Sequence, residues 1–141
     1  MRRLTLFALV LALVLAGASA AYAQAKDQTK CPVSGEPIDK KTSPSVEMQG
    51  QKVYFCCNKC VKEFKANPEK VFEKMAADGV VGENVQKTDP ICGMKVDPAK
   101  NKVLDWKGRR LYFCSDGCKA KFEKDPATYL KKLDEKPAAK S

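Results

Sequence analysis

The 141-residue chain contains no histidine, the residue that serves most often as a general base and as a nitrogen ligand for metals. Its absence excludes a Ser-His-Asp or Cys-His catalytic system and a zinc-metalloprotease helix. Acidic residues are also few, with 17 Asp and Glu against 26 Lys and Arg. Cysteine is present seven times. Any chemistry that this chain performs is therefore expected to rest on sulfur.

The N-terminal residues have the pattern of a secretory signal peptide. Two arginines precede an apolar run from Leu4 to Ala16, which is shorter than the about 20 residues of a membrane-spanning helix. The pattern Ala21-Tyr22-Ala23 predicts cleavage after its last residue, with cleavage after Ala20 as the second choice. An uncleaved membrane anchor is the alternative. We therefore expect a periplasmic or secreted protein that meets the membrane only transiently, through residues 1–23.

Export changes the interpretation of the cysteines, because thiols outside the cytosol tend to oxidise. Seven is an odd number, so a monomer with every cysteine in a disulfide is excluded. At least one thiol must be free, shared between two chains, or bound to a metal ion.

An internal repeat with an offset of 58 residues organises the chain. The aligned segments are Tyr54-Phe55-Cys56 with Tyr112-Phe113-Cys114, Cys60 with Cys118, Phe64 with Phe122, and Pro68 with Pro126. Upstream of these segments we expect the register to slip by three residues, so that Cys31-Pro32-Val33 matches Cys92-Gly93-Met94. The chain is therefore expected to be a tandem of two small modules.

The repeat predicts a small α+β fold. Its parts are a first module at residues 30–77, a linker at 78–88, a second module at 89–133 and a disordered tail at 134–141. Each module begins with a cysteine-bearing turn. A β-hairpin follows, because strand-forming runs flank Gln49-Gly50-Gln51 and its counterpart in the second module. Two short helices complete each module, and a proline begins the second helix.

Each module carries three cysteines, one in the turn and two at the start of a helix. The candidate metal ligands are Cys31, Cys56 and Cys60 in the first module and Cys92, Cys114 and Cys118 in the second. A helix N-terminus favours the thiolate, which is the form that binds metal. Three thiolates suit Cu(I), or Zn(II) with a fourth ligand. The alternative is one disulfide per module, but a single staple does not require three repeated cysteines.

The second module resembles the YHS domain, a TRASH-type, treble-clef-like metal-binding domain, in DPICGMKVDP followed by GRRLYFCSDGCKAKFEKDPATYL. The first module is similar to a divergent copy, with KCPVSGEPIDKK followed by GQKVYFCCNKCVKEFKANPEKV. The resemblance covers residues 30–133 and implies that the same six cysteines are the metal thiols. It also implies a role in the sensing, trafficking or resistance of heavy metals, including copper, in association with copper-transporting pumps.

Related treble clefs have a fourth cysteine three places after the first, and Ser34 and Lys95 stand at those places here. The missing thiolate favours Cu(I) or an exchangeable site over a closed structural zinc site. Cys57 is either an accessory thiol of the first site or a spare, semi-exposed cysteine. Met94 is either a thioether ligand for Cu(I) or, as we expect more strongly, a buried core residue.

The sequence predicts a non-enzymatic protein that holds soft metal ions, with Cu(I) favoured over Zn(II), for buffering, resistance or delivery to a membrane metal transporter. Nucleic acid is not an expected partner, because the chain is exported and its basic residues are scattered. One rival is a zinc- or disulfide-stapled interaction module. Another is a thiol-disulfide enzyme that uses Cys56, Cys57 and Cys60, although CxxC spacing occurs in one module alone. We expect the aromatic residues to form two cores and Trp106 to be exposed.

Overall fold

The computed structural model describes residues 25–135, so the predicted signal peptide lies outside the described residues. The elements in chain order are β1 (Lys26–Asp27), β2 (Ser45–Met48), β3 (Gln51–Tyr54), α1 (Asn58–Ala66), α2 (Pro68–Ala77), β4 (Val80–Val81), β5 (Glu83–Asn84), β6 (Lys102–Trp106), β7 (Arg109–Phe113), α3 (Asp116–Lys124) and α4 (Pro126–Asp134). Within residues 25–135, every helix is too short or too polar to cross a bilayer.

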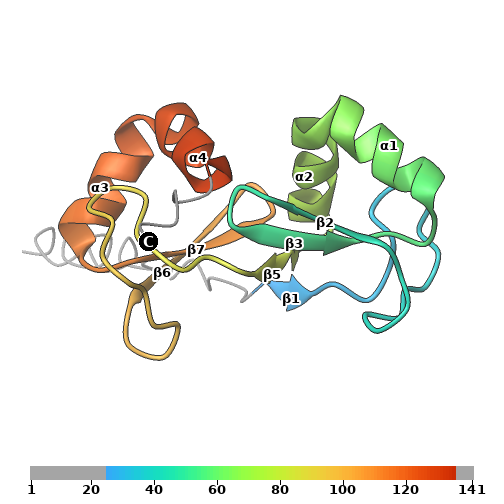
Figure 1. The fold of residues 1–141 in the computed structure, drawn as a ribbon, viewed down its shortest axis with the longest axis horizontal. Helices are drawn as coiled ribbons and strands as arrows, with labels where there is room; N and C mark the ends of the chain where they lie inside the picture. Colours follow the sequence, from blue (N-terminus) through green and yellow to red (C-terminus); the bar gives the residue numbers. More distant parts are fainter. Residues whose placement is uncertain (1–24, 136–141) are drawn as a thin grey trace, which may run out of the picture.

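Two halves of the same design follow one another along the chain (Figure 1). In the first half, β2 and β3 form an antiparallel hairpin, and α1 and α2 lie to one side of it. In the second half, β6 and β7 form the hairpin, and α3 and α4 lie to one side of it. The prediction of a small α+β fold, with a turn, a hairpin and short helices in each module, is therefore confirmed.

Both hairpins close through a two-residue turn, Gln49-Gly50 in the first and Lys107-Gly108 in the second. Both residues of each turn have positive φ, which defines a type I′ turn. Its backbone twist matches that of the paired strands, so it keeps the ladder in register. The expected three-residue turns are shorter because Gln51 and Arg109 join the strands.

The second helix of each half begins at a proline, as predicted. Pro68 and Pro126 occupy the first turn, where the missing N–H leaves no hydrogen bond unmade. The preceding residues, Asn67 and Asp125, cap these helices, and each side chain accepts a backbone N–H three residues further on. Local sequence therefore fixes where α2 and α4 begin.

Each half has its own core, built around aromatic rings. The first core contains Phe55, Phe64 and Phe72, and the second contains Phe113 and Phe122 with Trp106 packed against them. The expectation that Trp106 is exposed was wrong. Its ring is half-buried and meets Phe122 edge to face, with the centroids 5.6 Å apart. The position beside a hairpin turn did not reveal that β6 faces α3.

Residues 78–88, expected to be a linker, are hydrogen-bonded into the fold. β4 pairs in parallel with β1, and β5 pairs antiparallel with β3. Asn84 of β5 also donates from its side-chain amide to the Arg110 carbonyl in the second half, at 2.6 Å. The connection therefore belongs to both halves and holds them together.

The two halves meet directly at the beginning of β7. The Arg109 side chain is fully buried, with its guanidinium carbon 3.8 Å from the ring centroid of Phe72 in the first half. It also pairs with Glu69 of α2 at 2.6 Å. Nearby, the Gln51 side-chain amide exchanges two hydrogen bonds with the backbone of Arg110. The Arg109 side chain is fully buried where it contacts the first half, so the halves are expected to unfold together.

Candidate metal centres

The first thiol cluster lies between the N-terminal turn of the first half and the start of α1. The Sγ atoms of Cys31, Cys56 and Cys60 all lie within 4.8 Å of one another, and those of Cys56 and Cys60 are 3.7 Å apart. Cys31 and Cys60 are buried against the first aromatic core, whereas Cys56 is half-buried. The core therefore fixes two of the thiols and leaves the third near solvent.

Cys57 lies at the rim of this cluster. It is exposed, and its Sγ is 3.8 Å from that of Cys56 and 3.7 Å from that of Cys60. As the N-cap of α1 its side chain makes no capping hydrogen bond to the helix backbone, whereas its counterpart Ser115 caps α3 by accepting the N–H of Cys118. Asn58 and Asp116 are polar residues of the kind that often cap helices. In this structure they are instead the first helical residues of α1 and α3. An accessory role for Cys57 stays a prediction.

The second cluster contains three thiols and a carboxylate. The Sγ of Cys114 lies 3.3 Å from that of Cys92 and 3.5 Å from that of Cys118. A carboxylate oxygen of Asp89 completes a group whose ligand atoms all lie within 4.8 Å of one another. Hydrogen bonds with the Cys92 and Cys118 thiols raise the pKa of Cys114 to about 12. Sequence reasoning missed Asp89.

Asp89 is held rigidly in this cluster. It is 1% exposed, and its two oxygens accept the backbone N–H groups of Ile91 and Cys114 at 2.7 and 2.8 Å. Burial alone raises the pKa of this carboxyl group, but the two N–H groups outweigh that effect and hold it below its usual range. Asp89 is therefore a charged carboxylate that faces three sulfur atoms.

The predicted slip of three residues between the two turns is wrong. In both turns, the first residue donates its N–H to the carbonyl five residues on, and its own carbonyl accepts from the glycine four residues on. The residue that makes these bonds is Cys31 in the first half and Asp89 in the second, which are 58 positions apart like the rest of the repeat. Backbone hydrogen bonding therefore matches a cysteine with an aspartate.

The same register matches Ser34 with Cys92. Ser34 Oγ lies 3.1 Å from the Sγ of Cys56, as Cys92 Sγ lies beside the Sγ of Cys114. Each turn therefore has two positions that face the cluster, and only one of them is a cysteine. In the first half the position without a cysteine is Ser34, as expected. In the second half it is Asp89, and not Lys95 as expected. An ungapped repeat would have revealed this, because it aligns the prolines and glycines of CPVSG and DPICG.

Met94 is 61% exposed, so the expectation that it is a core residue was wrong. Its position is explained by the turn, in which the Met94 carbonyl accepts the Asp89 N–H. That bond fixes the backbone while the side chain lies outside the second core. A thioether role for Met94 stays a prediction.

The first cluster contains thiols of very different acidity. Burial opposes ionisation of Cys31, yet hydrogen bonds from the Ser34 side chain and backbone outweigh it and lower the pKa of Cys31 to about 7. Burial, together with the neighbouring Cys57 and Cys56 thiols, raises the pKa of Cys60 to about 12. One thiolate is therefore ready near neutral pH, and an arriving cation must displace a proton from Cys60.

In the metal-free, reduced protein, the ultraviolet thiolate absorbance is expected to show a step with a midpoint near pH 7 that is lost in Cys31→Ser. Because the folded pKa is lowered, the associated stability is complete above about pH 8.5, the pKa of an unfolded cysteine, and is lost as the pH falls through about 7. Ser34→Ala should move the step to higher pH. A step that is unchanged in both variants would contradict this assignment.

The dimensions of both clusters suit a metal ion. With metal–sulfur bonds of about 2.3 Å in a tetrahedral arrangement, the sulfur atoms lie about 3.8 Å apart. The Sγ–Sγ distance is 3.7 Å for Cys56 and Cys60, and the Sγ of Cys114 lies 3.3 Å and 3.5 Å from its two neighbours. The remaining ligand atoms of each cluster lie within 4.8 Å of one another, so small adjustments would accommodate an ion. No disulfide joins the seven cysteines, all of which lie within residues 25–135.

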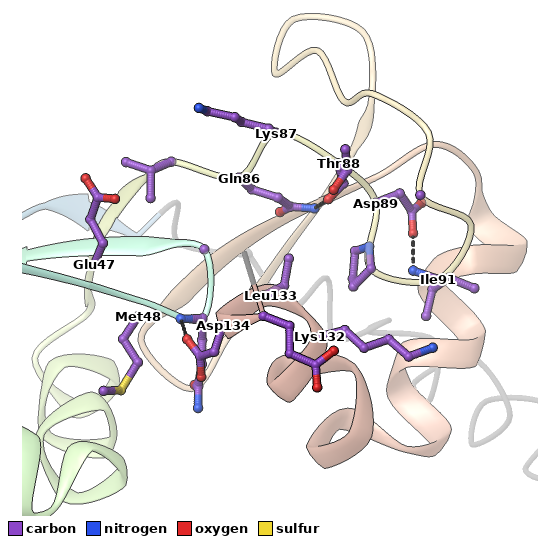
Figure 2. Close-up of a pocket in the computed structure, with 16 residues that line it drawn as sticks. Glu47, Met48, Gln86, Lys87, Thr88, Asp89, Ile91, Lys132, Leu133 and Asp134 are labelled. Atoms are coloured by element: carbon purple, nitrogen blue, oxygen red, sulfur yellow. Dashed lines mark hydrogen bonds between the residues drawn. The ribbon is translucent and has the colours of Figure 1, made fainter. Parts of the chain in front are cut away.

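An open cavity of about 970 Å³ lies beside the second cluster. The turn of the first hairpin forms one side of it and Asp89 and Ile91 form the other, with Leu133 and Asp134 of α4 between them (Figure 2). The thiols of the second cluster do not line this cavity. Of the four members of the second cluster, Asp89 alone lines it.

The fold and the clusters together define a pair of small cysteine-rich modules, each with a group of side chains that could hold a metal ion. The second of them is a YHS domain, because residues 87–132 match this family and include all four members of the second cluster. A copper-transporting P-type ATPase from Rhizobium leguminosarum bv. viciae is 44% identical over 59 residues, which are 41% of this chain and 6% of the ATPase. No solved structure matches the chain significantly.

Proposed function

We propose that this chain is an exported protein that binds soft metal ions, Cu(I) in preference to Zn(II), and buffers them, confers resistance or delivers them to a membrane metal transporter. The observation that carries the proposal is the convergence of three thiols in each half at distances that suit one ion. The likeness of part of the chain to a copper-transporting ATPase supports copper. Export rests on the sequence of residues 1–23.

The burial of the thiols favours exchange over permanent retention of the ion. Cys31 and Cys60 are buried and hold the ion from the core side, whereas Cys56 is half-buried. In the second half, Cys92 is exposed. A thiol of a partner protein can approach the ion on the exposed side before the buried ligands release it. The proposed activity is therefore binding and transfer, and it needs no catalytic group.

The native mass spectrum of the protein, isolated anaerobically from the extracytoplasmic fraction, tests this proposal. We expect a chain that begins at Gln24 and carries one metal ion in each half, copper among them, with its thiols reduced. A metal-free chain with two or three disulfides would overturn metal binding and favour a stapled interaction module. Absence of the protein from that fraction would overturn export alone.

A further inference from the structure

We infer that the two sites are built for different ions, the first for monovalent Cu(I) and the second for a divalent ion of the Zn(II) class. This inference rests on the proposed function, because it assumes that both clusters bind metal. It comes from a difference between two turns that share one backbone geometry. The first turn presents Cys31 and Ser34, and the second presents Asp89 and Cys92.

The first site offers sulfur and a neutral hydroxyl group. Cys31, Cys56 and Cys60 converge, and the Cys57 thiol lies within 3.8 Å of two of them. The Ser34 hydroxyl is beside Cys56, but a neutral hydroxyl is a weak ligand for a soft ion. Two or three thiolates without an anionic oxygen are the set that suits Cu(I).

The second site adds an anionic oxygen to three sulfur atoms. Carboxylates bind Zn(II) at about 2.0–2.2 Å and are hard ligands that Cu(I) does not favour. Three thiolates and the Asp89 carboxylate supply the four donors of a tetrahedral site. They also bring one more negative charge than three thiolates alone, which a divalent ion offsets better than a monovalent one.

Asp89 also has a structural role in its turn, and that role leaves it able to bind an ion. Each of its oxygens accepts one backbone N–H, from Ile91 or Cys114, and each has a second lone-pair direction. Such hydrogen bonds orient a metal-binding carboxylate. The equivalent position in the first half holds Cys31, whose Sγ belongs to the first cluster. This position therefore aims a side chain at the cluster in both halves.

The test begins with the reduced full-length chain under anaerobic conditions, given one equivalent each of Cu(I) and of Co(II), the spectroscopic substitute for Zn(II). We expect the visible bands of tetrahedral Co(II) to persist in Cys60→Ser and to be lost in Cys118→Ser, and copper binding to show the reverse pattern. Co(II) that occupies the first site as readily as the second would overturn the inference. A reduced chain that binds neither ion would overturn the proposed function itself.

An exchange of ligands between the turns isolates the cause. The double variant Asp89→Cys with Cys92→Ser gives the second turn the residues of the first, which that backbone already accommodates. We expect it to lose at least about tenfold of the second site's preference for Co(II) over Cu(I). The reciprocal variant, Cys31→Asp with Ser34→Cys, should gain Co(II) binding at the first site. It tests the same ligand exchange independently if the variant of the second site unfolds. Unchanged preferences in the folded variants would show that Asp89 serves the turn alone.

Discussion

Cys60→Ser is expected to lower the affinity of the first site for Cu(I) by on the order of 1,000-fold, whereas Cys57→Ser should lower it by less than about tenfold. Cys60 is 6% exposed and belongs to the three mutually close thiols, in the first turn of α1. Cys57 is exposed at the rim. Loss of Cys60 removes a ligand that the core holds in place, and loss of Cys57 removes a solvent-facing neighbour.

Competition with a chromophoric Cu(I) chelator measures the affinity of the first site in each variant, and the unaltered chain serves as the reference. Equal losses in the two variants would contradict the geometry and make Cys57 a full ligand. If the protein instead shows a disulfide reductase activity that is lost in Cys57→Ser, that result would favour the rival hypothesis of a thiol-disulfide enzyme.

Gly108→Ala is expected to destabilise the metal-free protein by about 3 kcal/mol, against about 1 kcal/mol for Gly50→Ala. Both glycines occupy the second position of a type I′ turn, with φ of 75° and 72°, so the cost of a left-handed alanine is shared. A methyl group at Gly108 would also clash with the backbone carbonyl of Phe72, whereas at Gly50 the nearest atom is 3.4 Å away. The difference therefore measures the close approach of the second hairpin turn to the Phe72 carbonyl.

Denaturant unfolding of the two variants under reducing conditions gives both values. If Gly108→Ala lowers the free energy of unfolding no more than Gly50→Ala does, the stability of the second hairpin does not depend on its contact with α2. The two halves would then be independent. A single, broader transition in Gly108→Ala would show that the clash has partly uncoupled them.

Burial could not be assigned reliably from local sequence. Trp106 stands beside a hairpin turn, where exposure is common, yet α3 covers it. Met94 is apolar and near a cysteine, yet the turn leaves it 61% exposed. In both cases the deciding factor is which distant element packs over the residue. A local pattern carries little information about that choice.

The sequence by itself determined the repeat, the hairpins, the helices that begin at prolines, and the six candidate thiols, because each depends on residues close together in the chain. The tertiary structure showed that the Asp89 carboxylate lies beside the three thiols of the second cluster. Matching cysteine to cysteine hid the equivalence of Cys31 with Asp89, since residue identity is a poorer guide to register than backbone hydrogen bonds. The tertiary structure also decided how the two halves pack against each other through Arg109. Its partners, Glu69 and Gln49, are 40 and 60 positions away in the chain, so no local pattern could predict these contacts.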